Sequence, residues 1–356
     1  MEFGARTLPP PAPVDTSKVV RDALSKTMTP NVAAMKAIKL TSDEEWEAFA
    51  ATANAKGAKG ACKFAEMFNV KVVEDTIAGV NVHWVTPPEI DKNHQQYLFL
   101  FIHGGAWFLN AGLSGTTEAV LIAARMKISV NSIDYRMPPK YPAPAAIDDA
   151  SAVWKELLKK TPPASVIMGG TSAGGNITLS SVHRFKDLGL PLPGALYIGT
   201  PAVDVDLTGD SRFINEGVDR LLITWKPLPQ EAGAMYAGEL GKTHPYVSPI
   251  YGDFTGFPPS CIIAGTRDLM LSDAVRARRS LRRAGAEADL HNYEGFSHGD
   301  YLVIWNAPES EEHCTELNRF VLNNLSNPLP LQSDIHEGSE KFEIPKSTIY
   351  RDVGHS

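Results

Sequence analysis

One serine of this chain lies between small residues, in the stretch Met168-Gly-Gly-Thr-Ser-Ala-Gly-Gly-Asn176. The centre of this stretch, from Gly170 to Gly174, fits the pattern G-x-S-x-G, with an apolar run before it and the helix-compatible run 177–185 after it. A serine on a sharp turn from a strand into a helix is held with its hydroxyl exposed. The N-terminus of the following helix stabilises negative charge that develops there. The pattern therefore predicts Ser172 as the nucleophile of an acyl transfer.

A serine hydroxyl attacks well only when a base removes its proton and an acid orients that base. His298 follows the last predicted strand in a glycine-flanked loop, which makes it the expected base. Asp268 follows an apolar strand, at the carboxyl edge of the sheet where α/β proteins build their sites. Asp273 is the alternative acid, although a carboxylate beside Ser272 at a helix start commonly serves the helix N-terminus. We favour Asp268 because it lies directly at the strand end.

The stretch His103-Gly-Gly-Ala-Trp107 follows the apolar run 97–102. Attack on an ester carbonyl creates an oxyanion, which requires N–H donors that are already in place. The amides of Gly104 and Gly105 can approach such an oxygen because neither residue has a side chain. The amide of Ala173, next to the serine, is the expected third donor. His103 is expected to fix the loop rather than act as a second base, since a base must reach the serine oxygen.

Strand-like and helix-like runs alternate along most of the chain. The predicted strands are 70–76, 80–85, 97–102, 128–135, 165–168, 195–198, 260–264 and 288–293. The helix-compatible runs among and after them are 116–126, 145–160, 173–187, 272–284 and 310–325, and two more, 16–29 and 42–55, precede them. This alternation predicts an α/β protein with a mostly parallel eight-stranded sheet and helices on both faces. Only Ala78-Gly79 separates the first two strands, which predicts an antiparallel hairpin.

Six motifs in this order resemble those of the hormone-sensitive-lipase-like family of α/β-hydrolases, the bacterial family IV esterases. They are His103-Gly-Gly-Ala-Trp107, Asp134-Tyr-Arg-Met-Pro-Pro139, Tyr141-Pro-Ala-Pro-Ala-Ala-Ile-Asp-Asp149, Gly170-Thr-Ser-Ala-Gly-Gly175, Arg267-Asp-Leu269 and His298-Gly299. The resemblance covers about 70–325, and Thr171 is typical of the GTSAG branch. It implies the α/β-hydrolase fold with a helical cap, and carboxylesterase activity on short- to medium-chain acyl esters. It also implies that no metal or organic cofactor is needed, and it is the ground for expecting a homodimer.

The acid motif departs from the family pattern. It reads Asp-Leu-Met-Leu-Ser-Asp from residue 268 to residue 273, where the family has Asp-Pro-Leu-x-Asp. The start of the following helix is therefore shifted by one residue. For this reason Asp273 remains the alternative to Asp268.

Two segments fall outside the alternation of strands and helices, and they set the expected organisation of the chain. We expect N-terminal cap helices in 1–68, a hydrolase domain in 69–202 and 249–326, and a cap insertion in 203–248. The residues 327–356 form a polar, proline-bearing tail, which is either a disordered end or an arm on a partner subunit.

The composition limits the classes of partner. The chain has 356 residues, 43% of them hydrophobic and 21% charged, and its formal net charge is −7. That balance is ordinary for a globular protein, and no basic stripe with interleaved aromatic residues predicts a nucleic-acid partner. The sequence shows neither a secretory signal nor an apolar run long enough to span a bilayer, so we expect a cytoplasmic protein without stable membrane association. The cysteines, Cys62, Cys261 and Cys314, form no C-x-x-C pair and are expected to be buried free thiols.

The same catalytic residues would also serve lactones, amides or carbamates, which the sequence does not separate from esters. A ligand-binding receptor on this scaffold is the alternative outside enzymes. The presence of Ser172, Asp268 and His298 together disfavours it, because such receptors usually lose the base. A lipase is disfavoured by the lack of a broad apolar segment for lipid interfaces. The expected partner is a small-molecule ester.

Overall fold

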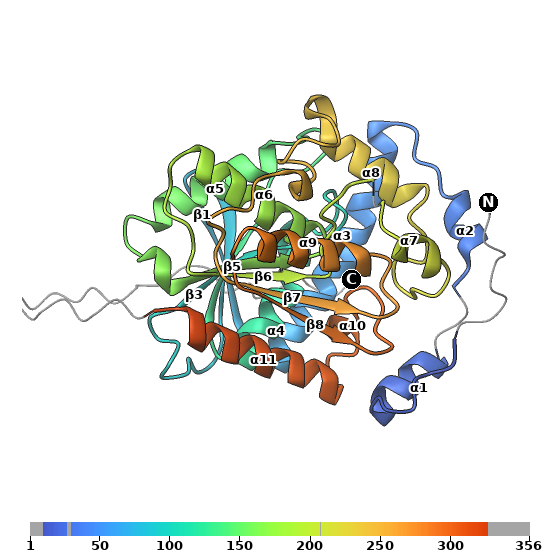
Figure 1. Cartoon of the computed structure of the whole chain (residues 1–356), viewed down its shortest axis with the longest axis horizontal. Helices are drawn as coiled ribbons and strands as arrows, with labels where there is room; N and C mark the ends of the chain where they lie inside the picture. Colours follow the sequence, from blue (N-terminus) through green and yellow to red (C-terminus); the bar gives the residue numbers. More distant parts are fainter. Residues whose placement is uncertain (1–9, 27–29, 207, 327–356) are drawn as a thin grey trace, which may run out of the picture.

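The computed structural model describes residues 10–26, 30–206 and 208–326 (Figure 1). Its centre is an eight-stranded sheet with the order β1-β2-β4-β3-β5-β6-β7-β8. The pairs β1–β2 and β2–β4 are antiparallel and the other pairs are parallel. The strands are β1 (Lys71–Ile77), β2 (Val80–Thr86), β3 (Leu98–Ile102), β4 (Ser129–Ile133), β5 (Val166–Thr171), β6 (Ala195–Gly199), β7 (Ser260–Gly265) and β8 (Ala288–Tyr293). The predicted mostly parallel eight-stranded sheet is confirmed.

The hairpin at one edge of the sheet is also confirmed. Ile77 pairs with Val80, and the two residues between them have φ angles of 51° at Ala78 and 81° at Gly79. Two successive residues with positive φ are the requirement of the tight turns that join antiparallel strands.

Helices cover both faces of this sheet (Figure 1). The helices α4 (Thr117–Met126) and α11 (Pro308–Asn324) pack on one face, and α5 (Ala145–Leu157), α6 (Ala173–Asp187) and α9 (Leu271–Arg283) pack on the other. Successive side chains of a strand point to opposite faces. In β3, Leu100 and Ile102 therefore join the cluster that contains α6, whereas Phe99 and Phe101 join the cluster that contains α4. The apolar side chains of β3 therefore contribute to the hydrophobic cores on both faces of the sheet.

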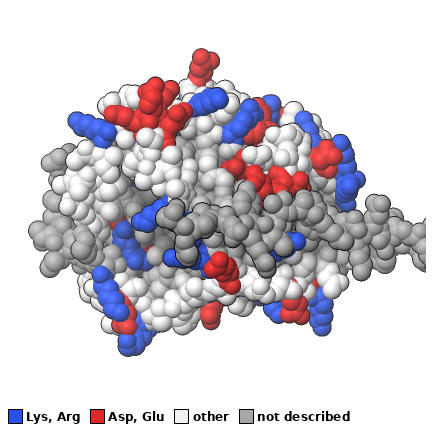
Figure 2. All heavy atoms as spheres, turned by 180° about the vertical axis from the view of Figure 1, so that it is seen from behind, with Lys and Arg blue, Asp and Glu red and all other residues white. Residues whose placement is uncertain are grey.

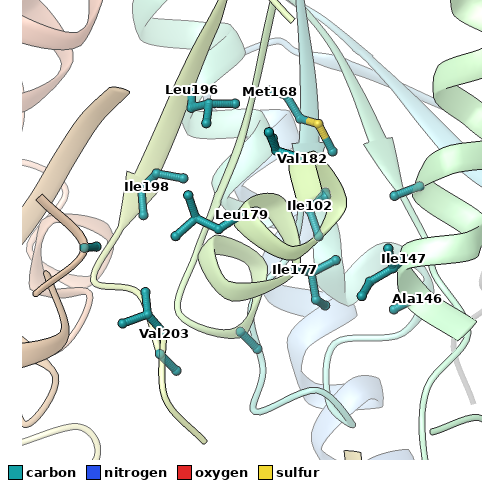
Figure 3. Close-up of a cluster of buried hydrophobic side chains, with 14 of the residues drawn as sticks. Ile102, Ala146, Ile147, Met168, Ile177, Leu179, Val182, Leu196, Ile198 and Val203 are labelled. Atoms are coloured by element: carbon teal, nitrogen blue, oxygen red, sulfur yellow. The ribbon is translucent and has the colours of Figure 1, made fainter. Parts of the chain in front are cut away.

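The helix α6 begins just after the predicted nucleophile and is held by the first of these clusters. Figure 3 shows Ile177, Leu179 and Val182 of α6 against apolar side chains of neighbouring strands, and these three side chains are fully buried. Burial of a side chain of this size contributes roughly 1.5–3 kcal/mol. These buried contacts fix α6, and with it the start of the helix, on the sheet.

Two regions that are remote in sequence pack against each other beside the loop that follows β3. The first carries α2 (Val32–Ala37) and α3 (Asp43–Met67), and the second carries α7 (Ser211–Ile214) and α8 (Leu228–Ala237). Trp46 of α3 and Ala232 of α8 share a buried cluster with Phe108. The Trp46 and Phe108 rings meet edge-on at 4.8 Å, and Lys36 Nζ lies 3.0 Å from Glu216 Oε1. This contact is compatible with the proposed cap made of 1–68 and 203–248.

The N-terminal helices differ from the prediction in extent. The helix α1 (Lys18–Lys26) lies inside the predicted range 16–29, but the predicted range 42–55 is too short, because α3 continues to Met67. A Cβ on Gly57 would lie only 2.0 Å from Ser114 Oγ, so glycine allows the close approach where α3 crosses residues 112–116. This tertiary contact outweighs the weak helix propensity of glycine. The sequence does not predict the short helices α2 and α10 (Asp300–Val303).

The surface carries charges of both signs. On the face shown in Figure 2, Lys and Arg side chains are interspersed with Asp and Glu side chains.

Within the described ranges, no helix has the length and apolar character needed to cross a membrane. The three cysteines are free, and Cys261 is buried as expected, but Cys62 is exposed on α3 and Cys314 is only partly buried on α11. The predicted tail, 327–356, lies outside the described residues.

Candidate active site

Ser172 lies at the turn between β5 and α6, where the G-x-S-x-G pattern predicts it. Its φ of 63° and ψ of −120° belong to a region that residues with a side chain rarely adopt. The turn is fixed by a hydrogen bond of 2.8 Å from the Ser172 N–H to the carbonyl oxygen of Gly199. A Cβ on Gly174 would lie 2.1 Å from the carbonyl oxygen of Ile102, so only glycine allows this close approach. The strained turn presents the serine at the carboxyl edge of the sheet.

The loop that follows β3 lies against this turn. A Cβ on Gly104 would lie 2.6 Å from the carbonyl oxygen of Thr171. The carbonyl oxygen of Gly104 lies 2.9 Å from His103 Nδ1 and accepts a hydrogen bond from Asn110 Nδ2 at 3.1 Å. The His103 ring stacks on Tyr135 at 4.3 Å, and burial lowers the pKa of His103. Burial thus favours the neutral form of His103, and its contacts with Gly104 and Tyr135 fix the loop, as expected from the sequence.

The structure brings His298 and Asp268 together. The His298 Nδ1 atom lies 3.2 Å from Asp268 Oδ1 and 3.4 Å from Oδ2. The Asp268 side chain is fully buried, and its Oδ1 also accepts a hydrogen bond of 2.7 Å from the Met270 N–H. Burial alone would lower the pKa of His298, but Asp268, followed by Asp219 and Asp300, outweighs burial and raises it. This environment stabilises a protonated imidazole, as a general base requires during acyl transfer.

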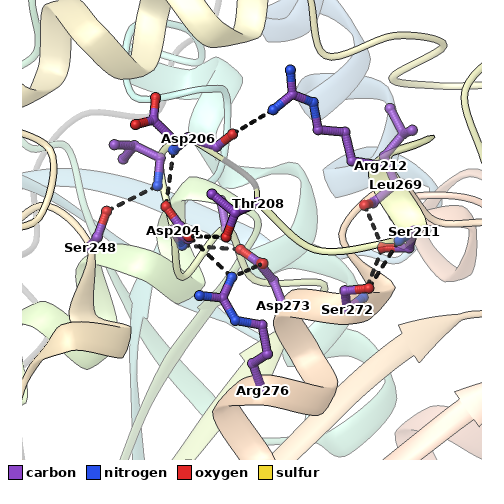
Figure 4. Close-up of polar contacts among 12 residues, drawn as sticks. Asp204, Asp206, Thr208, Ser211, Arg212, Ser248, Leu269, Ser272, Asp273 and Arg276 are labelled. Atoms are coloured by element: carbon purple, nitrogen blue, oxygen red, sulfur yellow. Dashed lines mark hydrogen bonds and ion pairs between the residues drawn. The ribbon is translucent and has the colours of Figure 1, made fainter. Parts of the chain in front are cut away.

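Asp273, the alternative acid, belongs to a different polar network (Figure 4). Its Oδ2 accepts a hydrogen bond of 3.0 Å from the Asp204 N–H, and its Oδ1 lies 3.1 Å from Arg276 Nη1. The same arginine nitrogen lies 3.1 Å from Asp204 Oδ2. Burial raises the pKa of Asp273 to about 8. The network ties the residues after β6 to α9, and the geometry favours Asp268 as the partner of His298.

Ser172 and His298 line one cavity of about 380 Å³. Gly104 and Gly105 line the same cavity, and Ala173 is the first residue of α6, where N–H groups have no partner inside the helix. The apolar part of the wall includes Trp107, Leu109, Leu221, Leu222, Trp225, Pro229, Met270, Leu302 and Val303. A volume of this size is typical of small-molecule sites. Among the described residues, no group of three or more His, Cys, Asp or Glu side chains is arranged to hold a metal ion.

Glu118 lines the cavity, although the sequence does not predict it as a site residue. It lies in the first turn of α4 and is buried. Its Oε1 accepts hydrogen bonds from Thr171 Oγ1 at 2.6 Å and from the Tyr197 hydroxyl at 3.2 Å, and Thr171 Oγ1 also lies 2.8 Å from the Tyr301 hydroxyl. Burial raises the pKa of Glu118 to about 7. A glutamate in the first turn of a helix is ordinarily a surface charge at the helix N-terminus, so no local pattern distinguishes this one.

The Glu118→Gln variant should change how stability depends on pH. A carboxyl whose pKa rises on folding, here from 4.5 to about 7, stabilises the folded state below pH 4.5, and this contribution is lost as the pH rises through 7. Glutamine accepts the same hydrogen bonds without a charge. Between pH 5 and pH 8 the variant should therefore gain stability relative to the wild type, by at most about 3 kcal/mol at about 1.4 kcal/mol per pKa unit. Urea unfolding at the two pH values measures this difference.

The control for this prediction is Glu156→Gln on the surface of α5, where Glu156 pairs with Lys159. That variant should keep the pH dependence of the wild type. Equal pH dependence of all three proteins would mean that Glu118 does not titrate in this range.

Comparison with known proteins identifies the family. Residues 99–302 match the family described as alpha/beta hydrolase fold. The chain belongs to this family. An acetyl-hydrolase of Streptomyces hygroscopicus is 30% identical over 224 residues, which cover 63% of this hydrolase and 73% of the relative. An esterase of Acinetobacter venetianus is 29% identical over 226 residues, which cover 63% of this hydrolase and 74% of the relative.

Solved structures agree with this assignment. The crystal structure of an esterase E25 superposes on this α/β hydrolase with a TM-score of 0.88 at 42% identity, over 92% of this chain and 99% of that one. An esterase from the bacterial hormone-sensitive lipase family matches with a TM-score of 0.74, over 88% of this chain and 100% of that one. The identity of 22% in the second case shows a shared fold alone. The membership in the α/β-hydrolase family that the six motifs imply is confirmed.

Proposed function

We propose that this α/β hydrolase is a serine carboxylic-ester hydrolase that works through an acyl-enzyme. One observation carries the proposal: Ser172, on its strained turn, and His298 line the same cavity. His298 is in turn paired with the buried carboxylate of Asp268. The names of the relatives, esterase and acetyl-hydrolase, support it.

In the proposed reaction Ser172 Oγ attacks the acyl carbon while His298 takes its proton. His298 then passes that proton to the leaving alcohol, which departs as the acyl-enzyme forms. Asp268 holds the imidazole through Nδ1 and stabilises its charged form. Water then attacks the acyl-enzyme with His298 again as the base, and the acid product leaves.

The amides of Gly104, Gly105 and Ala173 are the proposed donors to the oxyanion. The Gly104 carbonyl, which shares a peptide plane with the Gly105 N–H, is held by His103 and Asn110. The His103 carbonyl, which shares a peptide plane with the Gly104 N–H, accepts a hydrogen bond of 2.9 Å from the Tyr135 hydroxyl. These two peptide planes are therefore fixed before substrate arrives. Donors that are fixed in advance cost no reorganisation when the charge develops.

The cavity supports a preference for short- to medium-chain acyl groups. Its volume of about 380 Å³ is near the lower end of ligand pockets, which begin at about 300 Å³. Leu221, Leu222 and Trp225 enclose it from the side of the cap. A long acyl chain would have to leave the cavity and lose contact with this wall.

Hydrolysis of a series of p-nitrophenyl esters tests the proposed function. We expect the highest kcat/KM among acetate, butyrate and octanoate, and a value at least about tenfold lower for palmitate, because the cavity does not hold the distal methylenes. Matched γ-lactone, anilide and carbamate substrates measured in parallel address the other bond types. A protein that binds these compounds but turns over none of them would instead be a receptor.

A further inference from the structure

The segment 215–220 contacts the acid loop, residues 265–270, which carries Asp268. Asn215 Nδ2 donates hydrogen bonds to the carbonyl oxygens of Asp268 at 2.8 Å and Thr266 at 3.2 Å. Asp219 Oδ2 accepts a hydrogen bond of 3.0 Å from the Leu269 N–H. The segment therefore holds the backbone on both sides of the Asp268 side chain, and Asp219 and Asp268 are fully buried.

The same segment also contacts the base loop, residues 295–300, which carries His298. The Arg220 N–H donates to Ser297 Oγ at 3.1 Å, and Arg220 Nε lies 2.8 Å from Asp300 Oδ1 and 3.1 Å from Oδ2. Asp300 Oδ2 in turn accepts a hydrogen bond of 2.7 Å from the Ser297 N–H, and Asp300 is fully buried. The loop is thus held just before His298 and again two residues after it.

Asp219 also reaches the wall of the cavity. Its Oδ1 accepts hydrogen bonds from the N–H groups of Leu221 at 2.9 Å and Leu222 at 3.0 Å, and both leucine side chains line the cavity. One buried carboxylate therefore joins the acid loop to the surface that substrate would touch.

We propose that Asn215, Asp219 and Arg220 form a brace that positions Asp268 and His298, and that Asp219 also adds negative potential beside the imidazole. This inference rests on the proposed function, because it assigns a role in the same reaction. All three are positioning residues, since they act through the two loops and not on the substrate.

Asp268 and His298 lie on two separate loops, 30 positions apart in the chain, so each loop has to be held in place for the two side chains to pair. A buried acid–base pair works only when both partners are held at the correct distance before substrate binds, and a misplacement of 1 Å costs about a hundredfold in rate. The brace supplies charge-assisted hydrogen bonds to both loops, and these are stronger than neutral ones. Because one segment bonds to both loops, it fixes the position of Asp268 relative to His298.

The charge of Asp219 contributes to the same site. Burial, and then the neighbouring Asp268, raises the pKa of Asp219, whereas the N–H groups of Leu221, Leu222 and Leu269 favour its charged form. The negative charge of Asp219 raises the pKa of His298. The other charged or titratable groups around His298 are Asp268, Asp300, Glu118 and Arg220.

Kinetics of Asp219→Asn test the positioning role. Asparagine keeps the size of the side chain and one acceptor but removes the charge. We expect kcat on p-nitrophenyl butyrate to fall by about tenfold to a hundredfold with KM within about twofold, because the remaining amide oxygen can still accept from the N–H groups of Leu221 and Leu222, which line the cavity. The matched control is Asp206→Asn, since Asp206 lies in the same insertion but is half-exposed and pairs with Lys242 at 2.7 Å. The control should keep the wild-type kcat and KM.

The pH profile separates an electrostatic effect from a merely structural one. The acid limb of kcat/KM reports the base of the free enzyme. Removal of the negative charge in Asp219→Asn should move this limb to lower pH, and removal of the positive charge in Arg220→Gln should move it to higher pH. Titration of the His298 ring by NMR in a Ser172→Ala background should show the same two shifts without turnover, with His298→Asn used to assign the signal.

The kinetics and the His298 titration of these variants can each overturn the proposed brace. A folded Asp219→Asn variant with wild-type kcat and an unchanged His298 titration overturns it. If that variant does not fold, Arg220→Gln and Arg220→Lys decide, because the brace requires the lysine variant to recover part of the kcat that the glutamine variant loses, and equal values overturn it. Absence of ester hydrolysis in the wild type would contradict the proposed function alone, since the NMR titration still tests the brace.

Discussion

The Ser172→Ala variant should lose hydrolysis of p-nitrophenyl butyrate by a factor of about 10⁵ or more while remaining folded. Removal of the nucleophile leaves no atom that can form the acyl-enzyme, and the remaining rate comes only from the oxyanion donors and binding. Within the described part of the chain, the hydrogen bonds of Ser172 to Gly199 and Asn176 are made by its backbone and do not involve Oγ. Steady-state kinetics and circular dichroism of the purified variant measure the two expectations.

The matched control is Ser151→Ala on α5. Ser151 is a buried serine whose hydroxyl bonds, among the residues that the structure describes, to the carbonyl oxygen of Ile147 in its own helix. This variant should keep its activity. Retention of activity by Ser172→Ala would show that another group performs the attack, and the proposed mechanism would then fail.

The second large effect is expected at Asp268. The Asp268→Asn variant should lose about 10⁴-fold in kcat, because an amide in place of the carboxylate no longer fixes the tautomer of His298 or stabilises its charged form. Asp273→Asn should retain kcat within about tenfold, because Asp273 bonds to Asp204 and Arg276, whereas His298 pairs with Asp268. Kinetics of the two variants on one ester measure the difference.

The comparison of these two variants also resolves the departure in the acid motif. A large loss in Asp273→Asn with activity kept in Asp268→Asn would make Asp273 the acid and would contradict the geometry. Thermal unfolding of both proteins is the control. Asp273→Asn should change the stability of the contact between α9 and the residues after β6, whereas activity per folded molecule should remain.

The strands could be predicted because their signals are local. Each of the eight strands begins within one residue of its predicted start. The least accurate end is that of β5, which continues to Thr171, whereas the predicted strand stops at 168. Gly169 and Gly170 have weak strand propensity, but a Cβ on Gly169 would lie 2.3 Å from the carbonyl oxygen of Tyr197, so packing against β6 requires glycine there.

The serine turn, the acid and the base could be proposed from the sequence because each follows a strand end, and strand ends of a parallel sheet meet at one edge. Glu118 and the brace carry no such signal. Asn215 and Asp268 are 53 positions apart, and Arg220 and Asp300 are 80 apart. Their pairing depends on the path of the insertion over the sheet, which periodicity and turn chemistry do not determine.

The order of the strands along the chain has a consequence for synthesis on the ribosome. Chains emerge from the N-terminus at about 5–20 residues per second, so β5, β6 and Ser172 leave the ribosome before β7 and β8, which complete the sheet. Until β7 arrives, the free edge of β6 presents unpaired backbone groups, which favour pairing with other chains. A nascent chain stalled before residue 260 would therefore carry Ser172 without His298, and its unpaired β6 edge would favour aggregation.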